Sequence, residues 1–224
     1  MTKEAPRMKC LVSWSSGKDS AWLVHTLRAR GEVEIGALLT TVNERAGRVA
    51  MHAVRVALLQ AQADALGLPL WQVPIPSPCT NAEYERAMGE AVRRAVAEGF
   101  TAAAFGDLFL EDVRQYRIDR LAGTGLTPLF PLFGADTHQL ARDMVAAGLR
   151  ARLTAVDPRA LAPHFVGREF DAALLADLPP GVDPCGERGE FHTFAYDGPM
   201  FARPIPVALG EIVERDGFVF ADLV

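Results

Sequence analysis

Cysteine is scarce in this chain, and basic residues are not in excess. The 224 residues include three cysteines, Cys10, Cys79 and Cys185, none of which belongs to a Cys-x-x-Cys pair. This number and spacing argue against a disulfide framework and against a cysteine-bound metal centre. The formal net charge is -5, whereas a general nucleic-acid-binding protein usually carries a marked basic excess.

Long apolar segments are also missing. Half of the residues are hydrophobic, yet no run approaches the roughly 20 residues of a transmembrane helix. The first nine residues are mostly polar, unlike the apolar core of a secretory signal. We therefore expect a cytoplasmic protein with reduced thiols and no membrane contact. Its length is sufficient for a substantial buried core.

Two familiar nucleotide-binding signatures are absent. A Walker A loop requires glycine where this chain has Val12, and serine or threonine where it has Asp19. The Gly-x-Gly-x-x-Gly fingerprint of dinucleotide-binding folds is not found either. Instead, an apolar run ends in Ser15-Ser16-Gly17-Lys18-Asp19-Ser20, which opens an amphipathic segment. Backbone N–H groups and the helix dipole make such a junction an anion-binding site. The alternative is a plain strand–turn–helix junction with a serine N-cap.

Strand and helix signals alternate along the first half. The pattern predicts strands at residues 11–14, 35–41, 70–75 and 101–105, and helices at residues 18–30, 51–66, 80–98 and 111–121. Such alternation favours an α/β fold in which a parallel sheet is covered by helices on both faces. Ligands then bind at the carboxyl ends of the strands. The Ser15–Ser20 loop and Gly106-Asp107 both follow predicted strands, so both are expected at that edge.

The second half is less regular. The pattern predicts helices at residues 137–147 and 170–178, and strands at residues 149–156, 207–213 and 218–223. The last two strands are joined at Asp216-Gly217, a strong hairpin signal. Prolines in the segment 126–132 argue against a central strand there. We therefore predict a nucleotide-binding domain at 1–122 and a smaller α+β domain at 123–224, with the boundary between 106 and 125.

A second polar cluster lies near the carboxyl end, at residues 183–193. Gly186-Glu187 and Gly189-Glu190 repeat a glycine–glutamate pair, and His192-Thr193 follow. The two carboxylates suit Mg²⁺ or an ammonium ion whose proton they accept, and His192 suits a base near neutral pH. The alternative is a solvated polar loop that leads into a strand.

Both clusters resemble signatures of known enzymes. Ser15–Ser20 resembles the Ser-Gly-Gly-Lys-Asp-Ser loop of the PP-loop ATP pyrophosphatases, with Ser16 where glycine is usual. Serine is a small change there unless the backbone needs a positive φ. Gly186–Thr193 resembles the G-E-N-G-E-[FY]-[EH]-T signature of the diphthine–ammonia ligase family, which also has a PP-loop. Residues between the two motifs match that family as well, at 51–52, 105–108, 110–117 and 129–132, so the resemblance runs from Cys10 to about Phe201.

The resemblance implies a HUP-type (Rossmann-like) nucleotide domain followed by a smaller substrate domain. It implies that ATP adenylates a carboxylate, which is diphthine on elongation factor 2 in that family, and that ammonium supplies the amine that displaces AMP. Pyrophosphate is the other product. ATP and Mg²⁺ are the expected cofactors, and ATP, AMP, ammonium and a carboxylate acceptor are the expected partners. An acceptor other than elongation factor 2 stays open, as does a homodimer.

Roles for single residues follow from the two motifs and from the resemblance. The expected catalytic residues are Lys18, Asp19, Glu187, Glu190 and His192, with Asp19 and Glu187 as Mg²⁺ ligands. The expected nucleotide-binding residues are Ser15, Ser16, Gly17, Lys18, Asp19, Ser20, Leu39, Thr40, His52, Gly106 and Asp107. The expected substrate-binding residues are Arg114, Tyr116, Arg117, Gly186, Gly189 and Thr193.

Purely structural roles are the alternative for several of these residues. Leu39 and Tyr116 also suit a hydrophobic core, and His52 suits a surface helix. Arg114 and Arg117 lie three apart and also suit ion pairs with Glu111 or Asp112 on the same helix.

Two other functions remain in view. One is a PP-loop enzyme that thiolates tRNA, which would use Cys79 or Cys185 as the sulfur carrier. The other is an adenine-nucleotide-binding protein without chemistry, because fold alone does not specify activity.

Overall fold

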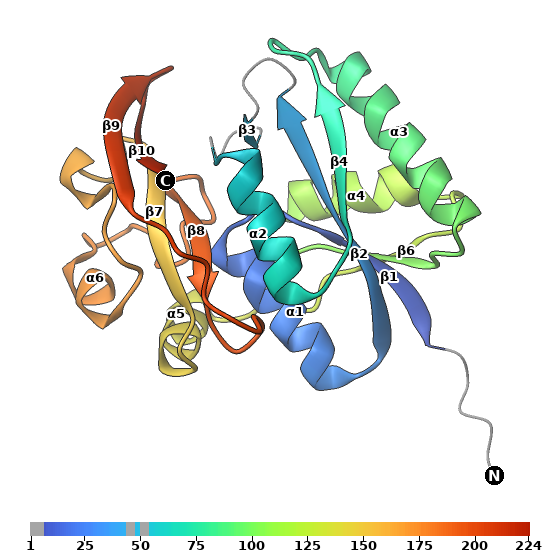
Figure 1. The fold of residues 1–224 in the computed structure, drawn as a ribbon, viewed down its shortest axis with the longest axis horizontal. Coiled ribbons are helices and arrows are strands. Elements are labelled where there is room, and N and C mark those ends of the chain that lie inside the picture. Colours follow the sequence, from blue (N-terminus) through green and yellow to red (C-terminus); the bar gives the residue numbers. More distant parts are fainter. Residues whose placement is uncertain (1–6, 44–47, 50–53) are drawn as a thin grey trace.

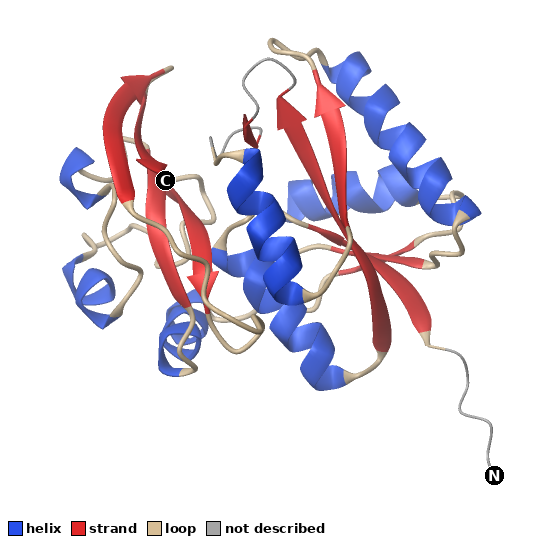
Figure 2. Cartoon of the chain, viewed as in Figure 1, coloured by secondary structure: helices blue, strands red, loops and turns tan. Residues whose placement is uncertain are grey.

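The chain folds around two β-sheets that lie side by side. The computed structural model describes residues 7–43, 48–49 and 54–224. Figure 1 shows the sheet of the first half on the right and the sheet of the second half on the left, with helices between and around them. Figure 2 shows the same arrangement by element type. The predicted α/β class is confirmed.

The first sheet is mainly parallel. Its parallel strands run in the order β4-β2-β1-β5-β6, and β3 pairs antiparallel with the end of β2. The strands are β1 (Met8–Ser13), β2 (Val33–Asn43), β3 (Arg48–Val49), β4 (Leu70–Ile75), β5 (Ala102–Ala104) and β6 (Thr127–Leu129). The proline-containing β6 lies at the edge, as predicted for 126–132.

Four helices belong to this sheet. They are α1 (Lys18–Arg30), α2 (Val56–Leu66), α3 (Asn81–Ala97) and α4 (Glu111–Leu121). The predicted bounds of α1 and α4 are confirmed to the residue. The helix predicted at 80–98 is found at Asn81–Ala97, where Thr80 and Glu83 form a capping box at its start. The helix predicted from residue 51 begins later, at Val56, and residues 51–53 lie outside the described residues.

Helices cover both faces of the first sheet. Cys10 and Val12 of β1 pack into the core formed with α1 and α2. Leu11, between them, points to the opposite face and joins a smaller core with residues of α3 and α4. Because successive strand residues face opposite sides, a strand buried on both faces reads as one continuous apolar run.

The second sheet is antiparallel, with the order β8-β7-β10-β9. Its strands are β7 (Arg150–Val156), β8 (Phe191–Asp197), β9 (Leu209–Arg215) and β10 (Phe218–Leu223). The helices of this half are α5 (Thr137–Ala146), the short 3₁₀ helix η1 (Pro163–Phe165) and α6 (Ala172–Asp177). The predicted hairpin is confirmed, and Asp216 and Gly217 both have positive φ, as a type I′ turn requires.

The two halves share an extensive buried surface. α1 lies against β8 (Figure 1), and one hydrophobic core contains side chains from both halves. The backbone N–H of Ala202 also donates to the carbonyl of Ala65 at 2.8 Å. The domain boundary between 106 and 125 stays a prediction. Among the described residues, none of the helices is both long and apolar enough to cross a membrane.

Candidate functional site

The Ser15–Ser20 loop lies where β1 ends and α1 begins. Gly17 is the N-cap of α1. The Ser20 hydroxyl donates to the carbonyl of Gly17 at 3.0 Å, and the Ser15 hydroxyl donates to that of Ser20 at 3.2 Å. A Cβ on Gly17 would lie 3.3 Å from two oxygens of Thr193, so glycine allows the second half to approach closely here.

Ser16 has an unusual conformation within this loop. Its φ is +70°, its side chain is fully buried, and its hydroxyl has no hydrogen-bond partner among the described residues. A left-handed backbone costs an L-residue about 1–2 kcal/mol. The backbone at this position does need a positive φ, so serine in place of the usual glycine is not a small change here.

Gln62 of α2 holds the loop in place. Its fully buried amide nitrogen donates to the carbonyl of Ser16 at 3.0 Å and to that of Ala195 at 2.6 Å. Its amide oxygen accepts from the indole N–H of Trp14 at 3.0 Å. The N–H of Ala195 in β8 also donates to Ser16 O, at 2.9 Å. Gln62 is not among the residues expected from the sequence, where its only signal is an amide side chain on the apolar face of a helix.

Lys18 connects the loop to the second half. Its backbone N–H donates to the Thr193 hydroxyl at 3.1 Å. Its buried ammonium donates to the Asp19 carboxylate at 2.9 and 3.1 Å and to the carbonyl of Cys185. Burial alone would lower the pKa of Lys18, but the charge and hydrogen bond of Asp19, together with the charges of Cys185 and Asp183, outweigh it and the pKa is raised above its ordinary value. Lys18 is therefore a charged group at the junction of the two halves.

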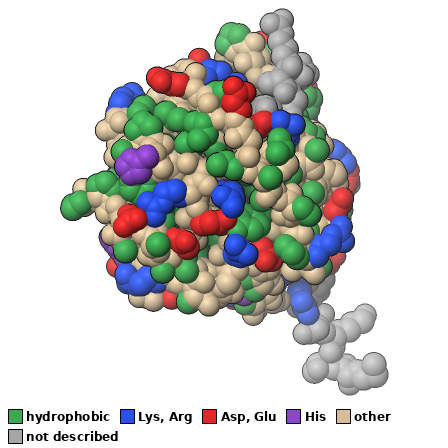
Figure 3. Space-filling model, turned by 60° about the vertical axis from the view of Figure 1, so that its left-hand side comes forward, with side chains coloured by type: hydrophobic (Ala, Val, Ile, Leu, Met, Phe, Trp, Pro, Cys, Tyr) green, Lys and Arg blue, Asp and Glu red, His purple; other side chains and the backbone are tan. Residues whose placement is uncertain are grey.

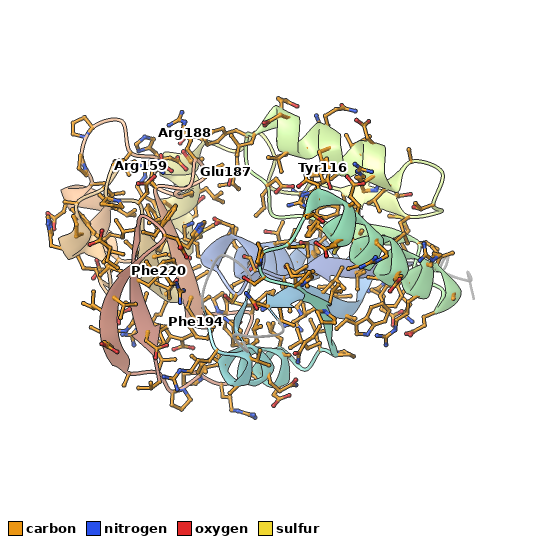
Figure 4. All side chains as sticks on the ribbon, turned by 90° about the horizontal axis from the view of Figure 1, so that it is seen from above. Tyr116, Arg159, Glu187, Arg188, Phe194 and Phe220 are labelled. Atoms are coloured by element: carbon orange, nitrogen blue, oxygen red, sulfur yellow. The ribbon has the colours of Figure 1, made fainter. Side chains whose placement is uncertain are left out.

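The two glutamates of the second motif occupy different environments. Glu190 is buried, and its two carboxylate oxygens accept the backbone N–H groups of Asp183 and Arg188, both at 3.0 Å. Glu187 instead reaches across to the first half, where it accepts the N–H of Leu108 at 2.8 Å. In Figure 4, Glu187 and Arg188 lie together at the margin of the second half. Glu190 thus braces its own loop, whereas Glu187 links the two halves.

Burial raises the pKa of Glu187 to about 7. The N–H of Leu108 opposes this shift, while the nearby charges of Asp19 and Asp107 add to it. A carboxyl with this pKa gains and loses a proton near neutral pH. It is therefore suited to proton transfer.

The other residues of the second motif are also placed. Gly186 has a φ of +68°, and a Cβ there would lie 2.8 Å from the carbonyl oxygen of Phe191, so the backbone requires glycine. Gly189 also has a positive φ. His192 lies on β8, opposite Ala155. Burial, followed by the charge of Lys18, lowers the pKa of His192 to about 4, so the ring is neutral at pH 7.

The loop after β5 and the start of α4 carry the remaining charged candidates. Gly106 lies against the backbone of Asp19. Asp107 accepts two hydrogen bonds from Arg117, at 2.6 and 3.2 Å. Arg114 pairs with Glu111 at 3.3 Å, which is the helical ion pair considered from the sequence. Arg117 instead forms its ion pair with Asp107, which lies ten residues earlier in the chain.

A cavity of about 220 Å³ adjoins the loop. It lies between the first sheet and helices α3 and α4, and its wall includes Ser15, Leu39 and Thr40. A second cavity, of about 450 Å³, lies between α3 and α4 and includes Tyr116. Arg117 is among the side chains that line both cavities. Leu39 and Thr40 are buried, and His52 lies outside the described residues.

Two family models match the chain. Residues 8–126 match the diphthamide synthase N-terminal domain, and residues 136–220 match the diphthamide synthase C-terminal domain. The chain belongs to the diphthamide synthase family. The resemblance inferred from Ser15–Ser20 and Gly186–Thr193 is thereby confirmed.

Relatives described as diphthine–ammonia ligase align over much of this family member. The Homo sapiens protein is 26% identical over 237 residues, covering 92% of this chain and 85% of the human protein. The Bos taurus protein is 28% identical over 178 residues, covering 71% of this chain and 65% of the bovine one. The Schizosaccharomyces pombe protein is 27% identical over 229 residues, covering 93% of this chain but only 37% of the yeast protein.

The cysteines of this diphthamide synthase family member bear on the thiolation alternative. Cys185 is buried, and its thiol donates to the carbonyl of Thr137 at 3.5 Å. Burial raises the pKa of Cys185 far above its ordinary value, and that of Cys10 to about 12. Both thiols are therefore protonated at neutral pH. Since the thiolate is the reactive form, Cys185 is not suited to carry sulfur, whereas Cys79, the other candidate, is a free and partly exposed thiol.

Carboxylates near the loop bear on metal binding. Within residues 7–43, 48–49 and 54–224, no group of three or more His, Cys, Asp or Glu side chains is placed to hold a metal ion. Mg²⁺ is commonly held by one or two carboxylates together with substrate phosphates. The partly exposed carboxylate of Asp19 fits that pattern.

Proposed function

We propose that this protein is an ATP-dependent amide ligase. A carboxylate oxygen of the acceptor attacks the α-phosphorus of ATP, and pyrophosphate leaves. Ammonia then attacks the acyl carbon of the adenylate, and AMP leaves with the bonding electron pair. The observation that carries the proposal is the buried, unpartnered hydroxyl of Ser16 in a loop at the start of α1, beside a cavity at the strand ends.

The loop and the cavity fit two parts of one nucleotide. The N–H groups of the Ser15–Ser20 loop other than that of Lys18, which donates to Thr193, would bind the departing pyrophosphate, since helix N-termini favour anions. The 220 Å³ cavity is smaller than the pockets of about 300–1,000 Å³ that take drug-sized ligands, so a single purine base suits it. Leu39 and Thr40 of β2 would contact the base there. Asp107 and Gly106 lie on the opposite side of the loop from β2.

Mg²⁺ would be held by Asp19 and by phosphate oxygens. When bound, it would neutralise charge on the leaving pyrophosphate. The ammonium group of Lys18 adds a positive charge to the loop. It donates hydrogen bonds to the Asp19 carboxylate and to the Cys185 carbonyl, which fix its position. Glu187 is the second candidate ligand, and burial raises the pKa of both Asp19 and Glu187, so a bound cation would favour the ionised form of either carboxyl group.

Glu187 is the group that we assign to ammonium. An ammonium ion has no free electron pair, so it must lose a proton before it attacks the acyl carbon. The carboxylate of Glu187 would accept that proton, with Leu108 N–H holding its orientation. Glu190 is less suited, because both of its oxygens accept hydrogen bonds from its own loop.

The acceptor is a carboxylate, and diphthine on elongation factor 2 is the first to test because the curated relatives are named for diphthine. The protein is incubated with ATP, Mg²⁺, ¹⁵N-ammonium and elongation factor 2 that carries diphthine. We expect AMP, pyrophosphate and an amide that contains ¹⁵N. ADP as the nucleotide product would refute the adenylate route. AMP formed only with other carboxylates would keep the ligase and replace the acceptor.

Glu187→Gln tests the proton acceptor. Glutamine keeps an oxygen for Leu108 N–H but does not take a proton at neutral pH. We expect ATP binding to persist and amide formation to fall about 100-fold, within the range for general bases. Hydroxylamine, which is uncharged at neutral pH, should restore turnover. Glu32→Gln, in the exposed turn before β2, is the matched control.

A further inference from the structure

β9 is an edge strand with an unusual surface. It pairs with β10 on one side only, and none of its residues is buried. β8, the other edge strand of the second sheet, is mostly buried. Leu209, Ile212 and Val213 are 45%, 52% and 37% exposed, and they are three of the seven large apolar side chains that are exposed among the described residues. Figure 1 shows β9 at the outer margin, away from the first sheet. Figure 3, which brings this side forward, shows apolar side chains interspersed with charged ones.

The hairpin fixes which backbone groups face the free edge. In the turn from Arg215 to Phe218, the carbonyl of the first residue accepts from the N–H of the fourth, so Arg215 bonds toward β10. Bonding direction alternates along an antiparallel strand. The N–H and C=O groups of Ile212 and Glu214 therefore point outward, where an additional strand would pair with them. Beyond Ile212 the register shifts, and Ala208 exchanges hydrogen bonds with Val224 on the β10 side.

The charges of β9 are complementary to those of a second copy. When two copies of the strand pair antiparallel around Val213, Glu211 of each lies opposite Arg215 of the other. Ile212 of each then exchanges backbone bonds with Glu214 of the other. Pairing around Ile212 instead would set Glu211 opposite Val213 and leave Arg215 opposite Leu209. Opposite charges across a strand pair are favourable, so the register around Val213 is preferred.

We propose that β9 is a homodimer interface, through which the second sheets of two copies join edge to edge across a two-fold axis. The outward backbone groups supply the pairing, the two Glu211–Arg215 pairs set the register, and the exposed apolar side chains of β9 become covered. Such an interface uses one patch on both copies, as a two-fold dimer requires. The proposal does not depend on the chemistry at the nucleotide site.

Disulfide trapping tests the register. In a Cys79→Ser background, Val213→Cys brings two cysteines to a pair whose Cα atoms are about 4.5 Å apart, within the range that a disulfide spans. We expect a covalent dimer under mild oxidation. Ile212→Cys is the matched control, and its cysteines would lie on a diagonal and stay reduced. Trapping of Ile212→Cys in place of Val213→Cys, or of neither, would overturn the proposal.

A charge exchange tests the same interface without cross-links. Sedimentation velocity should show a dimer for the unmodified protein at micromolar concentration. Glu211→Arg and Arg215→Glu should each weaken dimerisation about tenfold, because each change places like charges opposite one another twice. The double exchange should restore it. A monomer at all concentrations, or a double variant no better than the single ones, contradicts the interface, provided that thermal melts show each variant folded.

Discussion

The two faces of the first sheet differ in how they are closed. On the face of α1 and α2, the loop is tied to β8 by hydrogen bonds from Lys18 N–H to the Thr193 hydroxyl and from Ala195 N–H to the Ser16 carbonyl, and Gln62 bridges the carbonyls of Ser16 and Ala195. On the face of α3 and α4, cavities of about 220 and 450 Å³ remain. The proposed phosphate end of the site is thus held rigidly, whereas the proposed base end has space for a ligand.

This difference makes the second half part of the proposed nucleotide site. Ser16 keeps a costly backbone conformation because its carbonyl accepts from two donors, Gln62 and Ala195. Strained conformations persist only where the surroundings fix them. Substitutions on the α1–α2 face should therefore change stability, and those on the α3–α4 face should change affinity.

The largest effect is expected for Gln62→Leu. It leaves the Trp14 indole N–H unpaired in the core and removes one donor to each of the carbonyls of Ser16 and Ala195. Buried groups without partners cost about 1–3 kcal/mol each, so the free energy of unfolding should fall by about 3 kcal/mol. Urea denaturation measures it. Gln60→Leu, on the exposed side of the same helix, should change it by less than about 0.5 kcal/mol. Equal effects at both positions would contradict the stabilising role of the buried Gln62 hydrogen bonds.

His192 should give the next largest effect, through pH. The pKa of His192 is about 4 in the folded state, against an ordinary value of 6.5 that applies to the unfolded chain. The folded state therefore favours the neutral ring, and the stability from this group is complete above pH 6.5 and is lost as the pH falls toward 4. The loss should reach about 3 kcal/mol. His192→Gln should remove this dependence and the exposed His138→Gln should keep it, as followed by denaturation at a series of pH values.

Ser16→Gly should have a smaller effect of opposite sign. Glycine relieves the positive φ and removes the unpartnered hydroxyl, against its own entropy cost, for a net gain of about 1 kcal/mol. Ser15→Gly is the matched control, because the Ser15 hydroxyl does have a partner, and stability should fall. Thermal unfolding compares the two. A stability loss for both would show that Ser16 is not strained.

The smallest effect on stability is expected on the other face. Val92 of α3 lines both cavities, so Val92→Phe should fill space without breaking buried hydrogen bonds. Stability should change by no more than about 1 kcal/mol, while AMP should bind about tenfold more weakly by calorimetry. Val96→Phe, which lines the larger cavity but not the smaller one, should leave AMP affinity unchanged.

Local signals account for what the sequence predicted well. The bounds of α1, the capping box of α3 and the Asp216-Gly217 hairpin each depend on residues within a few positions of one another. The order of the second sheet and the contact of β8 with α1 depend on pairing between distant segments. No short-range pattern carries that information.

The candidate site shows the same limit. From the sequence, Glu187 and Glu190 are equivalent, since each follows a glycine in the same motif. The structure separates them, because Glu190 turns into its own loop and Glu187 reaches Leu108 of the other half. Gln62 lies 46 residues after Ser16 in the chain, and only folding brings the two together.

A crystal structure with a non-hydrolysable ATP analogue and Mg²⁺ is the most direct test of the proposed site. The account predicts the triphosphate against the backbone of Ser15–Ser20, the base in the cavity beside Leu39 and Thr40, and the α-phosphorus on the side facing Glu187. A triphosphate bound elsewhere, with the Ser15–Ser20 loop making no contact to it, would contradict the account.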